Sequence, residues 1–279
     1  KAFRADSIAL GTSDFRIHEV QGSGTASPLV GQSVTVEGIV TGSFQAATNL
    51  GGFFMQEEDV NADNDPLTSE GIFVFHSATP VVVGNKVRVT GTVVEFGTAQ
   101  ATLTEISTAT VSIVSTTNPL PAAITLTLPV AALGDLERYE GMRVQVAQTL
   151  TVSEHFNVAR YGEVTLSANG RLMQPTQFID PNDSPASGTS ASGNSNVAAI
   201  NAQVNLNARS SILLADVNSI QNTFAIPFFD PNNNTLRTGS TVSALSGILT
   251  HSFGNHAIHP TTPPMFNYAP RRRGQSGRI

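Results

Sequence analysis

The chain has 279 residues, no cysteine and a formal net charge of −6. The absence of cysteine excludes disulfides, zinc–thiolate sites and thiol nucleophiles, and no apolar run is long enough to span a membrane. An acidic body repels phosphate backbones at long range, so any contact with nucleic acid requires a local basic strip. Only 13% of the residues are charged, two are lysines, and the sequence starts at Lys1 rather than Met. We therefore expect a secreted protein whose signal peptide has been removed.

The first part of the chain alternates apolar and polar residues, a pattern typical of strands. An extended arm at 1–15 precedes five expected strands, at 34–40, 52–56, 71–75, 86–96 and 110–114. Several of these strands carry an internal glycine, which suits the bend that lets a short sheet curl. Five short strands of this kind predict an OB-like barrel over residues 16–116.

The same strand pattern returns after a linker at 115–121 that contains two prolines. Further strands are expected at 142–153, 162–174, 211–215, 241–251 and 257–259, and one short helix at 129–137. A low-complexity insertion at about 180–207, rich in Ser, Asn, Ala and Gly, predicts a surface loop. The second module covers 119–268, and a basic tail with four arginines follows at 269–279. The fold class is therefore all-β, with two tandem OB-like (five-stranded, partly open) barrels.

The acidic segment 59–70 has the spacing of a twelve-residue calcium loop, which places oxygen ligands at positions 1, 3, 5, 7, 9 and 12. Position 9 is Leu67, which has no side-chain oxygen, and both flanks have strand patterns. The alternative is an acidic, solvated hairpin loop. Calcium is the one cofactor that the sequence predicts. Its expected ligands are Asp59, Asn61, Asp63, Asp65 and Glu70.

Two short clusters of arginine and tyrosine are the candidate nucleic-acid contacts. OB-like barrels bind single strands by stacking bases on aromatic rings in a basic groove. The alternative is that these arginines pair with neighbouring glutamates. The candidate residues are Arg138, Tyr139, Arg143, Arg160 and Tyr161.

Three of the six histidines, His251, His256 and His259, lie close together in the sequence. On one strand, His256 and His259 point to opposite faces, so a shared metal would need a bend between them. We expect surface or turn histidines here, with a transition-metal site as the alternative.

Several motifs carry a family resemblance. They include Ile17-His-Glu-Val-Gln-Gly22, Gly52-Phe-Phe-Met-Gln56, Leu136-Glu-Arg-Tyr-Glu-Gly-Met142 and Arg171-Leu-Met-Gln-Pro-Thr176, with further matches at 65–75, 161–163, 236–239 and 252–260. In this order they resemble the non-catalytic, OB-like N-terminal region of secreted bacterial extracellular endonucleases. In that family a nuclease domain of the endonuclease/exonuclease/phosphatase superfamily follows.

The resemblance implies no catalytic residue in this chain, because the family's metal and catalytic residues belong to the nuclease domain that would follow. Searches for a nucleophile elbow, a zinc-protease His pair, a P-loop and a dinucleotide fingerprint also find no match. We expect a non-catalytic accessory or binding region of a secreted nuclease-family protein that binds DNA and calcium. The alternative is an extracellular structural or self-assembling protein that associates through edge strands or the N-terminal arm.

Overall fold

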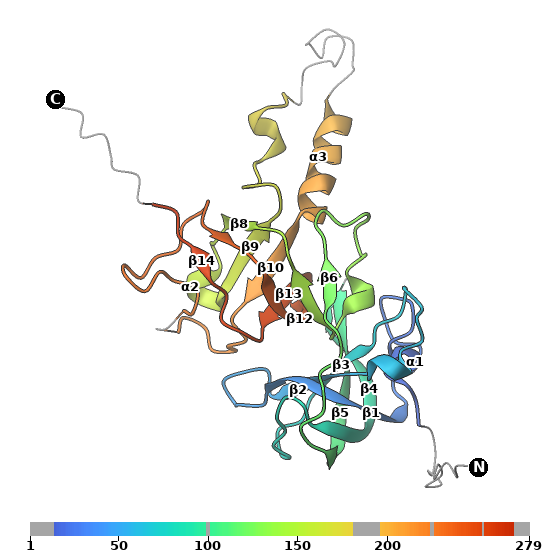
Figure 1. Cartoon of the computed structure of the whole chain (residues 1–279). Coiled ribbons are helices and arrows are strands. Elements are labelled where there is room, and N and C mark those ends of the chain that lie inside the picture. The colour runs from blue at the N-terminus through green and yellow to red at the C-terminus, as the bar shows by residue number, and fades with distance from the viewer. Residues whose placement is uncertain (1–13, 99–100, 181–195, 224–225, 253, 271–279) are drawn as a thin grey trace, which may run out of the picture.

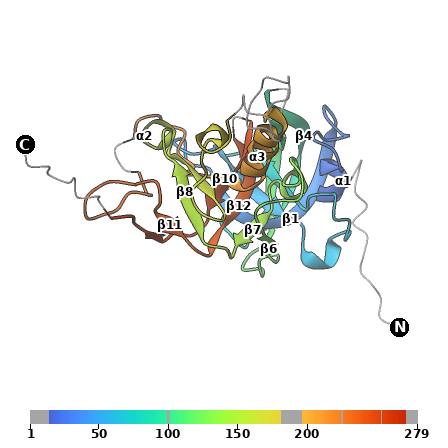
Figure 2. The ribbon, with the colours of Figure 1, turned by 90° about the horizontal axis from the view of Figure 1, so that it is seen from above.

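The computed structural model describes residues 14–98, 101–180, 196–223, 226–252 and 254–270. Strands dominate these residues and form two curled sheets that lie side by side, as the prediction of an all-β protein requires (Figures 1 and 2). No helix in the described ranges is long and apolar enough to cross a membrane.

The first barrel is closed by five strands in the order β1-β2-β3-β5-β4. The long strand β1 closes it, because its first half pairs with β4 and its second half pairs with β2. Strands β3 and β5 pair in parallel, and the other described strand pairs of this barrel are antiparallel. The short helix α1 (Ile17–Gln21) places Ile17 and Val20 in the core of this barrel. The strands are β1 Ser33–Phe44, β2 Gly52–Gln56, β3 Gly71–Val74, β4 Lys86–Thr98 and β5 Ala101–Ser115.

The second sheet has nine strands in the order β14-β11-β8-β9-β10-β13-β12-β7-β6. Strands β7 and β8 follow one another in the chain yet lie at opposite ends of the six-strand run from β8 to β7, so the sheet curls back on itself. The parallel pair β10–β13 corresponds to β3–β5 of the first barrel, and β12–β7 corresponds to β4–β1. The two barrels therefore share one topology. The strands are β6 Ile124–Leu126, β7 Arg143–Val146, β8 Leu150–Glu154, β9 Glu163–Ser167, β10 Ser211–Ala215, β11 Thr241–Val242, β12 Leu245–Ser252, β13 Asn255–Pro260 and β14 Phe266–Asn267.

Three expected strands are interrupted or end early. The strand expected at 241–251 is divided into β11 and β12, because Ala244 between them has φ +53°. The strand expected at 142–153 is interrupted between β7 and β8, where the Gln148 side chain bonds both the N–H and the carbonyl of Leu128. The strand expected at 162–174 ends at Ser167, because Asn169 and Gly170 both have positive φ, 63° and 96°, and form a turn.

The helical predictions also need correction. Residues 129–137 form turns rather than a helix, since Gly134 has φ +89°, and only the 3-10 turn η2 (Glu137–Tyr139) follows. Part of the expected loop at 180–207 is the helix α3 (Val197–Arg209), while 181–195 lies outside the described residues. Its Ala, Leu, Gln and Arg residues favour helix. The helix projects from the second barrel and buries none of its residues (Figure 1).

A third apolar cluster joins the two barrels. Phe44, Phe54, Phe73 and Leu103 lie on the outer face of the first barrel and pack with Ile248 of β12 in the second. At the same junction Gln56 Oε1 accepts the N–H of Arg143 at 2.9 Å. The barrels therefore meet through a small apolar core as well as polar contacts.

The backbones of Gly71 and Gly141 meet at this junction without a side chain between them. A Cβ on Gly141 would lie 2.7 Å from the carbonyl carbon of Gly71, and Gly141 has φ +75°. The Ser69 hydroxyl donates to the Glu140 carbonyl at 2.5 Å beside this contact. Glycine is needed here because any larger residue would separate the two barrels.

His259 is buried in the same junction, where its ring centroid lies 6.0 Å from that of Phe44. Burial lowers the pKa of His259 from its ordinary 6.5 to about 4. A hydrogen bond with the backbone of Ala215 raises the pKa, but by less than burial lowers it. Its Nδ1 has no hydrogen-bond partner in the part of the chain that the structure describes. The imidazole is therefore neutral at the junction.

We predict that Gly71→Ala lowers the free energy of unfolding by about 1–3 kcal/mol, the usual cost of forcing atoms into a packed site. The added methyl would lie 2.5 Å from the Met142 nitrogen. Urea unfolding followed by circular dichroism measures the change, because the chain has no tryptophan to report it by fluorescence. Gly24→Ala is the control, since its added Cβ finds its nearest neighbour at 3.7 Å. Equal stability of the two variants would contradict the close approach.

A second prediction concerns acid. His259 binds a proton near pH 6.5 in the unfolded chain but only near pH 4 in the folded protein. The unfolded state therefore binds more protons between these values, and stability falls as the pH falls. Relative to His259→Gln, the wild type should lose about 2 kcal/mol of unfolding free energy between pH ~7 and ~4.5. If the unfolding free energies of the wild type and His259→Gln change equally with pH, His259 is not held neutral.

Candidate binding and metal sites

The face with which OB folds bind ligands is covered in the first barrel. These folds bind oligonucleotides and oligosaccharides across strands 2 and 3 and through the loops that flank them. In the first barrel that outer face carries Phe54 on β2 and Phe73 on β3, whose ring centroids lie 4.8 Å apart. Both rings are buried in the cluster that includes Ile248 of the second barrel. Docking of the barrels therefore occupies this face.

The corresponding loop of the second barrel, between β8 and β9, exposes aromatic and basic groups. It contains the helix α2 (Val158–Tyr161), which lies on the side of the second barrel away from the first (Figures 1 and 2). Phe156 is 87% exposed, and the guanidinium of the exposed Arg160 lies 5.0 Å from the ring centroid of Tyr161. Arg160 and Tyr161 belong to the predicted nucleic-acid contacts, whereas Phe156 was not among them, because a single aromatic residue in a loop has no periodicity.

The segment that follows β10 holds this loop in place. Gly162 ends α2 with φ +65°, and the carboxylate of Asp216 occupies the space that a Cβ on Gly162 would need. The N–H of Asp216 donates to the Gly162 carbonyl at 3.1 Å, and Arg160 Nε donates to Gln221 Oε1 at 3.0 Å. Backbone and side-chain contacts from the segment after β10 therefore hold the loop in place.

The other arginine–tyrosine cluster lies elsewhere, beside the junction. Arg138 Nη1 lies 3.5 Å from the Pro66 carbonyl, and its guanidinium stands 5.0 Å from the ring centroid of Tyr139. Arg143 Nη1 donates to the Pro121 carbonyl, and burial lowers the pKa of Arg143. The structure does not bring the two clusters together, and both junction arginines contact neutral carbonyl oxygens.

The acidic loop 59–70 lines a groove of about 360 Å³, which Arg138 and Tyr139 also line. Four of the five expected calcium ligands line it, Asn61 being the exception. Each aspartate already accepts backbone N–H groups: Asp63 from Asp65 at 2.7 Å, Asp65 from Leu67 at 2.9 Å and Asp59 from Ala122 at 3.0 Å. Asn61 donates to Glu58 at 3.3 Å instead of facing the loop's other oxygens.

Two loop carboxylates meet a histidine from α1 that the calcium spacing did not include. His18 Nδ1 lies 3.1 Å from Glu70 Oε2, and His18 Nε2 lies 3.9 Å from Asp63 Oδ2. One ligand atom from each of these three residues lies within 4.8 Å of the others. His18 is far from the loop in sequence, so only the folded chain shows this contact.

The histidines at 251–259 are less exposed than expected. His259 is buried, so the expectation of a surface histidine is wrong for this residue. His251 and His256 face one another across the β12–β13 hairpin with ring centroids 4.1 Å apart. Glu137 Oε2 lies 3.6 Å from His251 Nδ1 and 3.5 Å from His256 Nε2.

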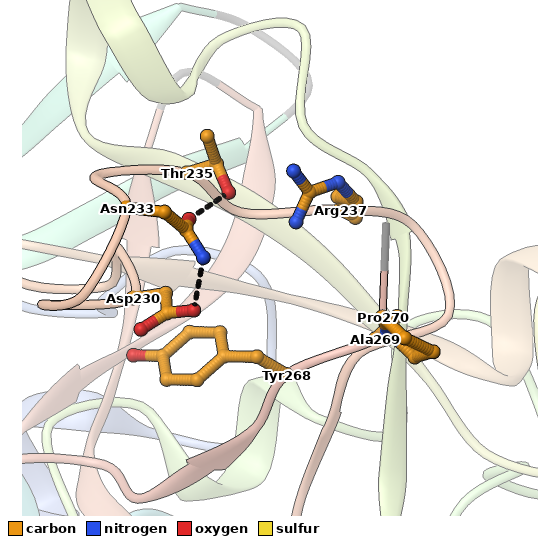
Figure 3. Close-up of a pocket in the computed structure, with 7 residues that line it drawn as sticks. All are labelled: Asp230, Asn233, Thr235, Arg237, Tyr268, Ala269 and Pro270. Atoms are coloured by element: carbon orange, nitrogen blue, oxygen red, sulfur yellow. Dashed lines mark hydrogen bonds between the residues drawn. The ribbon is translucent and has the colours of Figure 1, made fainter. Parts of the chain in front are cut away.

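A further hollow of about 410 Å³ lies beside the loop 230–237 (Figure 3). Asp230 accepts from Asn233 Nδ2 at 2.6 Å, and Asn233 accepts from the Thr235 hydroxyl. Arg237 and Tyr268 complete the walls, and Tyr268 donates its hydroxyl to the Phe229 carbonyl at 3.1 Å. These contacts use the polar groups to fold the loop itself, so we assign no ligand to this hollow.

The chain matches no protein-family model and no curated protein. The resemblance to secreted endonucleases therefore rests on the motifs given above, and function has to be argued from the geometry of the described residues.

Proposed function

We propose that the chain is a non-catalytic binding region of a secreted nuclease-family protein and that single-stranded DNA binds to its second barrel, beside the β8–β9 loop. The observation that carries this proposal is the contrast between the two barrels. The first barrel uses its strand-2 and strand-3 face to dock. The second barrel exposes Phe156 and Arg160 at the loop that OB folds use for ligands.

The chemistry of the loop fits a single strand better than a duplex. Exposed aromatic rings stack unpaired bases, and Arg160 supplies one positive charge for a phosphate. The outer face beside the loop carries half-exposed Thr165 and Leu213, which pair across β9 and β10. With so few basic groups in an acidic chain, affinity should depend on stacking more than on charge, and the salt dependence should be shallow.

We predict that Phe156→Ala weakens binding of a fluorescent single-stranded oligonucleotide roughly 5-fold or more, because one stacked base contributes about 1–3 kcal/mol. Arg160→Ala should weaken it less. Fluorescence anisotropy at low salt measures both.

Matched controls exist on the same barrel. Phe178 is 57% exposed near the insertion, and Arg171 is exposed beyond the opposite end of β9, so Phe178→Ala and Arg171→Ala should bind as the wild type does. Absence of binding by the wild type, or equal losses in the control variants, would reject the proposal.

We also propose that calcium binds to the acidic loop 59–70. Asn64 has φ 62°, the left-handed conformation that the sixth position of a calcium loop requires. Affinity should be weak, in the range of extracellular calcium modules, because the aspartates already accept backbone N–H groups.

We predict that millimolar calcium raises the melting temperature of the wild type by about 2 °C and leaves Asp63→Asn unchanged. Asp135→Asn, on the second barrel, is the matched control and should respond as the wild type does. If calorimetry detects no heat of calcium binding and calcium leaves the melting temperature of the wild type unchanged, the calcium part of the proposal is wrong.

Self-association by strand addition is the alternative function. The described strands give it little support. The first barrel is closed, and the edge strands of the second sheet, β6 and β14, have three and two residues. Edges this short offer few backbone groups to a neighbouring chain. Most of the N-terminal arm, residues 1–13, lies outside the described residues.

A further inference from the structure

Two imidazoles and a carboxylate converge where the β12–β13 hairpin meets η2. The β12–β13 register sets His251 directly opposite His256, and Glu137 approaches both from the first position of η2. One ligand atom from each residue lies within 4.8 Å of the others.

The distances between these atoms fit a shared ion better than direct hydrogen bonds. Glu137 Oε2 lies 3.6 Å from His251 Nδ1 and 3.5 Å from His256 Nε2, whereas N–H···O bonds cluster near 2.9–3.0 Å. Tetrahedral zinc with ligands at about 2.0–2.2 Å separates its ligand atoms by roughly 3.3–3.6 Å. The two distances from Glu137 to the imidazoles therefore match the spacing of a tetrahedral metal site.

One polar atom of this cluster lacks an ordinary partner. His256 Nε2 is buried and has no hydrogen-bond partner in the described chain, and such an atom costs about 1–3 kcal/mol. A second carboxylate, Glu140, places Oε2 3.4 Å from His251 Nδ1. A divalent cation would give His256 a partner and offset the repulsion between the two glutamates.

We infer that Glu137, His251 and His256 bind one zinc ion. Glu140 Oε2, 3.4 Å from His251 Nδ1, lies beside these ligands. Two imidazole nitrogens and carboxylate oxygens are ligands that zinc accepts, and no thiolate is present to bind a softer ion. His259, the third histidine of the sequence cluster, is buried in the junction and is not part of the site.

The proposed site also lies where the second barrel contacts the first. Glu140 Oε1 accepts the N–H of Thr104 at 2.9 Å, and His251 Nδ1 lies 3.1 Å from the Thr102 carbonyl. Both threonines belong to β5 of the first barrel. A carbonyl oxygen only accepts, so His251 Nδ1 carries a proton in its contact with Thr102, and zinc binding would displace that proton.

Tag-free full-length protein, stripped with a chelator and dialysed, tests the inference by calorimetric titration with zinc and by optical titration with cobalt(II). We expect one ion per chain, a higher melting temperature and the intense visible absorption of tetrahedral cobalt. His256→Gln and Glu137→Gln should each lower zinc affinity at least about tenfold and abolish that absorption. His155→Gln, in the β8–β9 loop, and His18→Gln, in the other His–Asp–Glu cluster, should keep both.

Unchanged affinity in His256→Gln and Glu137→Gln, or loss of zinc in His18→Gln alone, would overturn the inference. So would a wild type that binds no zinc, which would leave His251 and Glu140 as a simple hydrogen-bonded pair, or a cobalt complex without intense visible absorption. If one substitution prevents folding, the other variant and the wild-type cobalt spectrum decide the question.

Discussion

The contact between Gly71 and Gly141 is the constraint on which the arrangement of the two barrels depends. Two backbones meet there with no side chain between them, so β3 of the first barrel approaches the segment that leads into β7. That approach lets Phe54 and Phe73 pack in the cluster with Ile248. The outer face of β2 and β3, with which OB folds bind ligands, is therefore covered in the first barrel. A ligand is expected on the second barrel instead.

The two barrels share a strand topology but differ in their connections, which is where function in such folds is usually carried. In the second barrel the β8–β9 connection contains α2 with its exposed aromatic and basic groups, and the β9–β10 connection contains α3. The shared strands act as a scaffold. The differences between the copies support the proposal that the first barrel docks and the second binds a ligand.

The pattern of apolar and polar residues predicted several strands. It did not predict an exposed helix or the contacts between residues that are distant in the sequence. Strands β2 and β10 begin and end where expected. Strand β2 is a short run buried throughout, and in β10 buried Ile212 and Leu214 alternate with less buried residues. The helix α3 was missed because it buries no residue and so has no apolar stripe to detect. Glu137 and His251 are far apart in sequence, and the register of β12 and β13 that sets His251 against His256 is not encoded by spacing alone.

The charge balance at the junction separates structural carboxylates from those that need an ion. Glu57 is buried beside α1, but it accepts the Ile17 N–H at 3.2 Å and pairs with Arg16 at 3.0 Å, so a permanent cation offsets its charge. Glu137 and Glu140 face the imidazoles of His251 and His256 instead, and Glu140 also accepts the Thr104 N–H at 2.9 Å. Neutral imidazoles offset no charge, and a single protonated imidazole offsets the charge of only one carboxylate. Protonating both stacked rings would place two like charges about 4 Å apart. A divalent ion avoids these costs, because it binds neutral imidazoles and carboxylates at once.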